Sequence, residues 1–247
     1  MNQAFYTAAV GAQQQMVHMH IQGNNIANIN TQGYKAQKSR FVALFRRQIE
    51  SVDQGLQPYG VGNRMLMTST DHRAGSIHNT GLLHDYMIKG DGYFAVVDME
   101  TNEVSFTRRG RFSVVEYLRP TGEEDEFGNP ITETVQTMAD EEGRFALGKD
   151  GNIITVTDPE VKQDLGIFDY NNYDGMRHMS GTHFEPVDKN GALYYGTGEL
   201  VQGVLEGSNV DLAYTYTKVI EAQRAYSMAL KMVQTTDEIE TTINNLR

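Results

Sequence analysis

The sequence contains no cysteine and no tryptophan. Without cysteine, no disulfide can hold the fold together and no thiolate can act as a nucleophile or a metal ligand. Long apolar runs are missing too, because none approaches the roughly 18 residues that span a membrane. The first residues lack a basic segment followed by a continuous apolar stretch, which argues against a standard secretory signal. Two possibilities stay open: a cytosolic protein, or one exported without a cleaved signal.

Charge is unevenly distributed along the 247 residues, whose formal net charge is −11 at pH 7. An acidic surface of this kind disfavours nonspecific binding to nucleic acid or to anionic lipid. Residues 1–34 contain no Lys, Arg, Asp or Glu, whereas most of the acidic residues fall between positions 85 and 199. We expect the acidic runs in that middle region to be solvated loops.

A stripe of small and apolar residues repeats every three or four positions near the N-terminus, which predicts a helix. The stripe consists of Phe5, Ala9, Ala12, Met16, Met19, Gly23 and Ile26. The remaining positions are polar but uncharged, whereas an ordinary surface helix carries Lys and Glu there. Because a charge is costly to desolvate, this composition predicts burial among other chains, with disorder before assembly left open. The helix is expected to end near Gly33, which can adopt a positive φ.

A second long helix is predicted at the C-terminus, beginning near Ser208-Asn209, with Asp211 favourable to its dipole. Its stripe consists of Val219, Ala222, Tyr226, Ala229, Val233 and Thr236, continued with a shift of one residue by Ile239, Ile243 and Leu246. Unlike the first helix, it carries many charged side chains. We expect the two terminal helices to pair as a coiled coil, with the uncharged N-terminal one more deeply buried.

The middle of the chain has short alternating segments separated by turn residues, which predicts a mostly antiparallel β domain. The strand candidates are 86–88, 93–97, 104–106 and 112–114, and the turn candidates are 109–110, 127–130, 149–152 and 189–191. Residues 39–49 are predicted to be helical or turn-like, and residues 53–81 to be an extended connector. The predicted fold class is therefore α+β, with two terminal helices and a central β domain.

Catalytic and metal-binding motifs do not withstand inspection. Residues 90–92 lack the third glycine of a dinucleotide fingerprint, and residues 169–175 carry glycine at the seventh position of a calcium loop, not the sixth. The histidines show no metal-ligand spacing. The basic cluster at 108–111 has two equally supported interpretations: pairing with nearby carboxylates, or contact with an acidic patch on a neighbouring subunit. The sequence therefore predicts no catalytic, cofactor-binding or metal-binding residues, and a protein that is not an enzyme.

Residues 27–35, Ala-Asn-Ile-Asn-Thr-Gln-Gly-Tyr-Lys, resemble the Ala-Asn-x-x-Thr-x-Gly-aromatic-Lys signature near the N-terminus of bacterial flagellar rod and hook proteins. Residues 203–211 resemble the lead into that family's C-terminal helix, and the helix itself is matched at 220–226 and 235–238. Three further segments are similar to strands of the family's β domain: 89–94, 106–112 and 165–168. The acidic stretch 117–144 departs from the pattern and is interpreted as an insertion.

The resemblance implies a structural subunit of the flagellar basal-body rod, which the flagellar type III apparatus exports without a cleaved signal. Such subunits polymerise helically into a hollow shaft that transmits torque to the hook, with the terminal helices as an inner coiled-coil layer. The implied partners are copies of the chain, other rod proteins, the hook protein and the export apparatus, with no nucleic acid, small-molecule substrate or cofactor. The implied location is the flagellar basal body in the cell envelope. The length fits a rod protein. Residues 1–8 and 203–210 resemble the proximal type and residues 223–226 resemble the distal type, which is favoured slightly.

These expectations divide the chain into four segments: a helical assembly segment (1–50), an extended connector (51–84), the β domain (85–205) and a second helical assembly segment (206–247). The predicted assembly interface combines stripe and motif residues: Phe5, Ala9, Ala12, Met16, Met19, Ile26, Asn28, Thr31, Gly33, Tyr34, Asn209, Val219, Gln223, Arg224, Tyr226, Val233, Asp237 and Ile243. The alternative is a secreted β-rich binding module or adhesin whose helices serve only as a stalk.

Overall fold

The computed structural model describes residues 3–47, 58–124, 130–158, 161–179 and 181–246. Its contacts divide the chain into two compact units. Unit 1 comprises Met1–Ile29, Ala36–Asp71 and Val210–Arg247, and unit 2 comprises Asn30–Lys35 and His72–Asn209. Each unit is therefore assembled from segments that lie far apart in the sequence.

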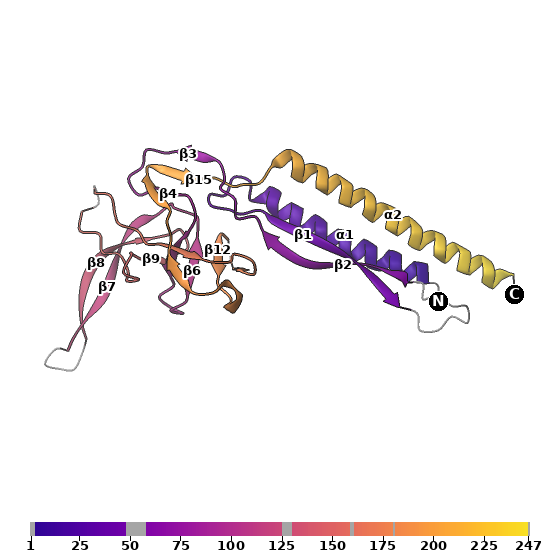
Figure 1. The fold of residues 1–247 in the computed structure, drawn as a ribbon, viewed down its shortest axis with the longest axis horizontal. Helices are drawn as coiled ribbons and strands as arrows, with labels where there is room; N and C mark the ends of the chain where they lie inside the picture. Colours follow the sequence, from indigo (N-terminus) through magenta and orange to yellow (C-terminus); the bar gives the residue numbers. More distant parts are fainter. Residues whose placement is uncertain (1–2, 48–57, 125–129, 159–160, 180, 247) are drawn as a thin grey trace. The chain divides into compact units, whose positions relative to one another are not determined.

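Unit 1 consists of the two terminal helices and a β-hairpin. Helix α1 (Gln3–Ala27) and helix α2 (Leu212–Asn245) run antiparallel and pack against each other, so that the start of α1 and the end of α2 lie toward the same end of unit 1 (Figure 1). Strands β1 (Gln37–Arg47) and β2 (Pro58–Thr70) form the hairpin, which packs on α1. Helix α1 thus lies between α2 and the hairpin, and the predicted pairing of the terminal helices is confirmed. Within the described residues, neither helix has the length and apolar character needed to cross a membrane.

Helix α2 begins with a side-chain cap and packs through a narrow row of small residues. The carboxylate of Asp211 accepts a hydrogen bond from the Tyr214 backbone N–H at 3.0 Å, so Asp211 is the N-cap, downstream of the start expected at Ser208-Asn209. The buried residues of α2 are Thr215, Ala222 and Thr236, seven and fourteen positions apart. A seven-residue spacing keeps small side chains on one face, which allows the two helices to approach closely.

The hairpin overturns one prediction. The segment expected to be helical or turn-like at 39–49 is strand β1 as far as Arg47, and residues 48–49 lie outside the described residues. Its pairing partner β2 lies within the stretch interpreted as a connector. The run from Phe41 to Phe45 is apolar at consecutive positions, so it has neither a helical nor a strand period. Pairing with β2, which the local sequence does not reveal, decides its conformation.

Unit 2 is the β domain, and every strand pair described in it is antiparallel, as predicted. The main sheet has the order β11-β12-β6-β5-β9-β8-β7, with β10 pairing β5 and β13, and two smaller sheets pair β14 with β4 and β15 with β3. The elements are β3 (Ile77–Asn79), β4 (Tyr86–Lys89), β5 (Tyr93–Val97), β6 (Val104–Thr107), β7 (Ser113–Glu124), β8 (Pro130–Ala139), β9 (Phe145–Ala146), β10 (Ile167–Tyr170), β11 (Arg177–His178), β12 (His183–Glu185), the 3-10 helix η1 (Asp188–Asn190), β13 (Leu193–Tyr195), β14 (Glu199–Gln202) and β15 (Val204–Glu206).

The core of unit 2 lies on both faces of β5. Tyr93 and Ala95 belong to one buried cluster, together with Phe106 and Phe184, whereas Phe94 and Val96 belong to the other. Successive side chains of a strand point to opposite faces, so a strand that is buried on both faces reads as a continuous apolar run. This explains why β5 was found at its correct bounds from sequence alone.

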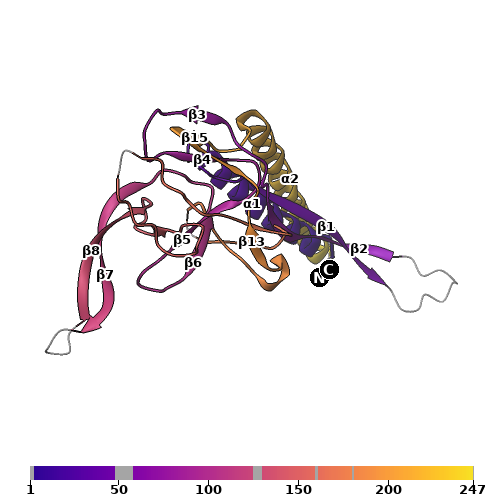
Figure 2. The ribbon, with the colours of Figure 1, turned by 60° about the vertical axis from the view of Figure 1, so that its left-hand side comes forward.

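The acidic stretch 117–144 is largely the β7–β8 hairpin, a long twisted ribbon that extends away from the rest of the sheet (Figure 2). Its expected turn at 127–130 lies almost entirely outside the described residues. At its base, Val135 and Met138 of β8 are buried, which anchors the ribbon to the core. Part of the stretch interpreted as solvated loop is therefore regular β structure.

Candidate assembly surface and clasp

The predicted interface residues divide into those that are buried within a single copy and those that it leaves exposed. Ala12, Gly33 and Tyr34 are buried, and Phe5, Met16, Gln223, Arg224, Asp237 and Ile243 are exposed. The others are partly buried: Ala9, Met19, Ile26, Asn28, Thr31, Asn209, Val219, Tyr226 and Val233. Most of these residues are spread along the two helices, and Tyr34 and Asn209 come together where the Asn209 N–H donates to the Tyr34 carbonyl at 3.4 Å.

The uncharged polar face of α1 is used in part within the same chain. The side chain of Asn25 both donates to the Gln37 carbonyl at 2.8 Å and accepts from the Gln37 N–H at 2.9 Å. Gln14 accepts from the Met65 N–H at 2.8 Å. These amides therefore satisfy backbone groups of the β1–β2 hairpin, which a charged side chain could not do without a desolvation cost. The hairpin is a partner that sequence reasoning missed when it assigned this face to other chains.

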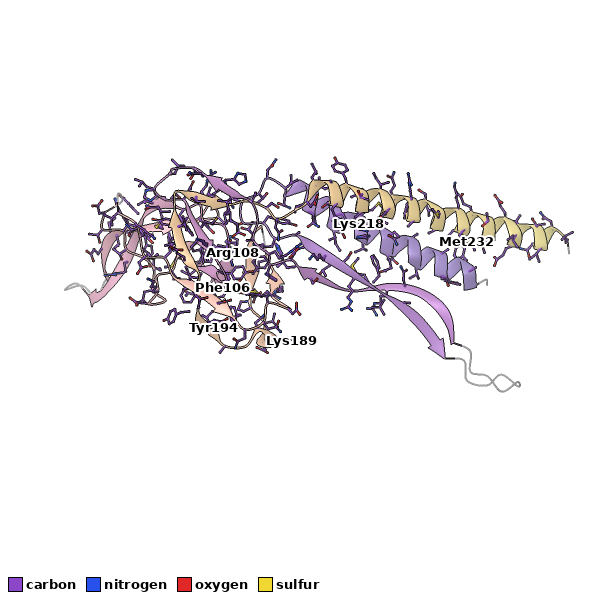
Figure 3. The ribbon with its side chains drawn as sticks, turned by 45° about the horizontal axis from the view of Figure 1, so that its top comes forward. Phe106, Arg108, Lys189, Tyr194, Lys218 and Met232 are labelled. Atoms are coloured by element: carbon purple, nitrogen blue, oxygen red, sulfur yellow. The ribbon has the colours of Figure 1, made fainter. Side chains whose placement is uncertain are left out.

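Helix α2 also carries an exposed apolar stripe toward its C-terminal end, beside its buried row, and Ile243 lies seven residues beyond Thr236 of that row. The stripe contains Met228, Met232, Ile239, Ile243 and Leu246, which are between 52% and 83% exposed. Figure 3 labels Met232, which lies on the C-terminal half of the helix. The spacing of four, seven, four and three residues matches a heptad seam that has no partner among the described residues. A continuous exposed apolar stripe of this length is typical of an interaction surface.

Unit 2 contains a buried charge cluster, here called the clasp and made of Lys35, Arg108 and Glu206. The Lys35 ammonium lies 2.6 Å from one Glu206 carboxylate oxygen, and the Arg108 guanidinium lies 3.4 Å from the other. Side chains of Lys35 and Glu206 are only 1% and 2% exposed. The Gly75 N–H donates to Glu206 at 2.9 Å, Lys35 donates to the Arg73 carbonyl at 2.8 Å, and Arg108 donates to the Ile88 and Gly90 carbonyls. The clasp thus joins three segments that are distant in the sequence.

Gly33 brings the N-terminal motif close to the clasp. Its N–H donates to the Glu206 carbonyl at 2.8 Å, and its φ is +68°. A Cβ at this position would lie 2.7 Å from the Cα of Arg109, which is closer than real contacts allow. Glycine is therefore required here for both its conformation and its lack of a side chain.

Each arginine of the 108–111 cluster lies beside a carboxylate of the same chain. Arg108 (labelled in Figure 3) lies beside Glu206, and the Arg109 guanidinium donates to the Glu141 carboxylate. Arg111 lies farther from its neighbours, 3.8 Å from Glu141 and 4.0 Å from Asp85. The intramolecular interpretation of the cluster is therefore confirmed. Sequence reasoning missed the clasp, although opposite charges inside the motifs 27–35, 106–112 and 203–211 were the available signal.

Two histidines and one carboxyl have shifted protonation in the folded chain. Burial lowers the pKa of His18, and the nearby Lys218 ammonium lowers it further. Burial also lowers the pKa of His178, whose ring lies against Phe184. Burial alone would raise the pKa of Asp140, but the His183 ring, whose Nε2 lies 3.2 Å from Oδ2, and hydrogen bonds from the Glu142 and Arg144 backbone N–H groups leave that pKa below its usual value. These shifts favour a neutral His18 and His178 and an ionised Asp140 at neutral pH.

Family models match both ends of the chain. Residues 5–35 match the model described as "Flagella basal body rod protein", and residues 201–246 match "Flagellar basal body rod FlgEFG protein C-terminal". The two matches contain Lys35 and Glu206, the two residues that form the shortest ion pair of the clasp. They also contain nearly all of α1 and α2.

Curated relatives match over the full length. The chain is 29% identical to the flagellar basal-body rod protein FlgG of Bacillus subtilis, with all of both chains covered. It is 27% identical to FlgG of Buchnera aphidicola subsp. Baizongia pistaciae, with 96% of both chains covered. A match to the flagellar hook protein FlgE of Treponema pallidum, at 32% identity, covers 46% of this chain and 26% of the hook protein.

Proposed function

This chain belongs to the family of bacterial flagellar basal-body rod proteins, and from that premise we propose that copies of it polymerise helically into the hollow shaft of the rod. It is a structural subunit of the flagellum in the cell envelope and not an enzyme. The matches cover 96% to 100% of the length of the rod proteins but only 26% of the length of the hook protein. This difference in coverage supports the rod over the hook. Nothing comparable supports a secreted binding module or adhesin.

The observation that carries the proposal is the exposed apolar stripe of α2, from Met228 to Leu246. Burying apolar surface is worth about 25 cal/mol per Å², so five large side chains in a seam supply several kcal/mol to a helical interface. A neighbouring copy can supply apolar side chains to contact this stripe, because Phe5 and Met16 of α1 are also exposed. A contact between different surfaces of successive copies builds an open helical filament when its rotation does not close into a ring.

In the proposed shaft, the two terminal helices form the inner layer around the channel and the β domain lies outside. The segments 1–50 and 206–247 act as the assembly parts and 85–205 as the outer domain, while 51–84 contains strand β2 of the hairpin before it leads into that domain. The predicted interface residues that a single copy leaves exposed, such as Phe5, Met16 and Ile243, make the contacts between copies. The remaining partners are other rod proteins, the hook protein and the flagellar type III export apparatus.

Within the rod we propose the distal segment, on the resemblance of residues 223–226. A strain that lacks the gene tests this assignment. Electron microscopy of its basal bodies is expected to show a short rod that has begun to assemble and carries no hook. A strain with no rod at all would contradict the distal assignment.

The test of assembly uses the full chain with Met232→Asp and Ile239→Asp, two substitutions on the exposed stripe. The matched control is Gln234→Asp with Thr241→Asp, which adds the same charge to exposed positions on another face of α2. We expect both proteins to fold, with circular dichroism unchanged, because all four side chains are exposed in the single copy. Only the stripe variant should fail to build rods and to spread in soft agar. Normal swimming by that variant would contradict the proposal.

A further inference from the structure

Helix α2 carries a further exposed apolar stripe, nearer its N-terminus. Its large side chains are between 40% and 53% exposed: Leu212, Tyr216, Ile220 and Leu230. Gln223 and Ser227, which share this face between Ile220 and Leu230, are exposed and uncharged. This set is here called the N-terminal stripe, and the set from Met228 to Leu246 the C-terminal stripe. Helix α2 therefore exposes apolar side chains along most of its 34 residues (Figure 1).

The two stripes lie on opposite flanks of the buried row of α2, which includes Thr215. An α-helix turns by about 100° per residue. Tyr216 of the N-terminal stripe therefore lies about 100° to one side of Thr215, and Met232 of the C-terminal stripe lies about 100° to the other side. Because both flanks are exposed in the single copy, one α2 can contact two neighbours at once, one through each stripe.

The two stripes match each other at one displacement along the helix. Copies that repeat along an open filament point in the same direction, so neighbouring α2 helices that line a channel run parallel. A displacement of sixteen residues brings three apolar pairs together: Leu212 with Met228, Tyr216 with Met232, and Leu230 with Leu246. Ile220 then lies between Met232 and Ile239 of the neighbouring helix, as a knob does between residues of a facing helix. This displacement corresponds to about 24 Å along the helix axis.

The same displacement brings two exposed, opposite charges together. Arg224 and Glu238 are both exposed, and neither has an ion-pair partner among the described residues. Arg224 lies about 80° around the helix from Tyr216, and Glu238 lies about 120° from Met232 in the opposite sense, so they border the same side of the contact. Glu238 is then level with Ala222 of the neighbouring helix, about 3 Å along the axis from Arg224. Helix α1 offers Glu238 no such partner, because residues 1–34 contain no charged side chain.

We propose that the C-terminal stripe of one copy packs against the N-terminal stripe of a second copy's α2, with the two helices parallel and displaced by sixteen residues. The apolar pairs supply the affinity, and the pair of Arg224 with Glu238 selects the register, because charges at the rim of an interface contribute more to specificity than to affinity. The inference rests on the proposed function, since it names the surface that covers the C-terminal stripe. The two stripes are different surfaces, so the contact builds an open filament when its rotation does not close into a ring.

Cysteine cross-linking tests the register, because the natural chain contains no cysteine. The full chain carrying Tyr216→Cys and Met232→Cys is produced in the gene-deletion strain, and isolated rods are oxidised. These positions lie about 24 Å apart on one helix, so a disulfide between them can form only between copies. We expect a ladder of covalent dimers, trimers and higher oligomers of this chain. The matched control, Tyr216→Cys with Ile243→Cys, uses a residue of the same stripe about 16 Å further along the axis and should give no ladder.

A charge exchange tests the pairing of Arg224 with Glu238. Adding Arg224→Glu to the cross-linking pair should lower the ladder yield about fivefold, because two like charges then face each other. Adding Glu238→Arg as well should restore the yield. The matched change Asp237→Arg, at an exposed acid one position away and about 100° around the helix, should not restore it. A yield that is insensitive to Arg224→Glu, or that Asp237→Arg restores equally, would overturn the pairing.

The same charge variants without cysteine give a second readout, spreading in soft agar. Arg224→Glu should reduce spreading, and the exchange with Glu238→Arg should restore it. Spreading that the exchange fails to restore would refute the register, whether or not the cysteine chains enter rods.

The outcomes separate this inference from the proposed function. Rods that contain the Tyr216→Cys, Met232→Cys chain but give no ladder would refute the register and leave the rod assignment standing, as would equal ladders from this chain and from the control. A cross-link to a different protein alone would also refute it, because the occupant would not be a second copy. Absence of the unsubstituted chain from isolated rods would refute the proposed function, and the inference with it.

Discussion

Removing the cation of Lys35 from the clasp should destabilise unit 2 far more than removing a surface lysine. In Lys35→Met, Glu206 keeps the Gly75 N–H at 2.9 Å and the Arg108 guanidinium at 3.4 Å. The Glu206 carboxylate therefore keeps part of its stabilising partners. Breaking a buried ion pair by removing one partner typically costs 3–5 kcal/mol, and we expect about 3 kcal/mol here.

The reverse substitution, Glu206→Gln, should cost more, about 5 kcal/mol. It removes the one carboxylate charge that lies beside both buried cations of the clasp, Lys35 and Arg108. Lys149→Met is the matched control, because Lys149 lies 2.6 Å from Asp164 but both side chains are exposed, at 60% and 73%. Exposed pairs contribute roughly 0–1 kcal/mol.

Urea denaturation of the purified full chain, followed by tyrosine fluorescence, gives the free energies of unfolding. The double variant Lys35→Met with Glu206→Gln should cost less than the sum of the single changes, because each removes the partner of the other. A cost for Lys35→Met no larger than that for Lys149→Met would refute the reasoning. So would strict additivity of the two clasp substitutions.

Three further changes have defined outcomes. Gly33→Ala should lower the stability by several kcal/mol, because the added Cβ overlaps the backbone of Arg109. Gly151→Ala, with a similar φ of +74° and open space around its Cβ, should lower it by only about 1 kcal/mol. Thermal unfolding compares the two variants, and equal losses of stability would contradict the packing argument. Asn25→Ala should lower the stability by about 1–3 kcal/mol, because the backbone N–H and carbonyl of Gln37 both lose a hydrogen-bond partner. The Gln37 amide should also exchange its hydrogen faster, and an unchanged exchange rate would contradict the prediction. The pKa of His178 is lowered on folding, so the unfolded chain takes up the proton first, and stability should fall as the pH falls below about 6.5. In urea titrations at pH 7 and pH 5, His178→Phe should reduce the difference in stability between the two pH values. An unchanged difference would count against this role of His178.

The helices were predictable because their own apolar residues recur every three or four positions, which is the period of a helix. The α2 row of Ala222 and Thr236 is buried, and the charged residues Arg224 and Asp237 are exposed, as the stripe indicated. Strand β5 was predictable for a related reason, since burial on both faces demands a continuous apolar run.

The β1–β2 hairpin was not predictable in the same way. Its strands are defined by backbone pairing between residues such as Phe41 and Met65, which lie more than twenty positions apart. Strand propensity depends strongly on such tertiary context, and the glycines of β2 weaken any local signal. Because the hairpin was missed, the amide-rich face of α1 was assigned wholly to other chains, although Gln14 and Asn25 bond to the hairpin.

The clasp was unpredictable for a different reason. Lys35 alone reads as a favourable cation after a helix, and Glu206 alone reads as a solvated acid. Only the approach of the 30–35 segment to β15 makes them a buried pair. A cavity lined by residues 81–85, residues 111–113 and Glu141 likewise exists only in the folded unit.

The most direct test of the central claim is electron cryo-microscopy of basal bodies isolated from cells that produce this chain. We expect the chain to repeat helically in the rod, with α1 and α2 innermost around the channel and the stripe from Met228 to Leu246 buried between copies. A rod that lacks the chain, or one in which the terminal helices face outward with that stripe exposed, would contradict it.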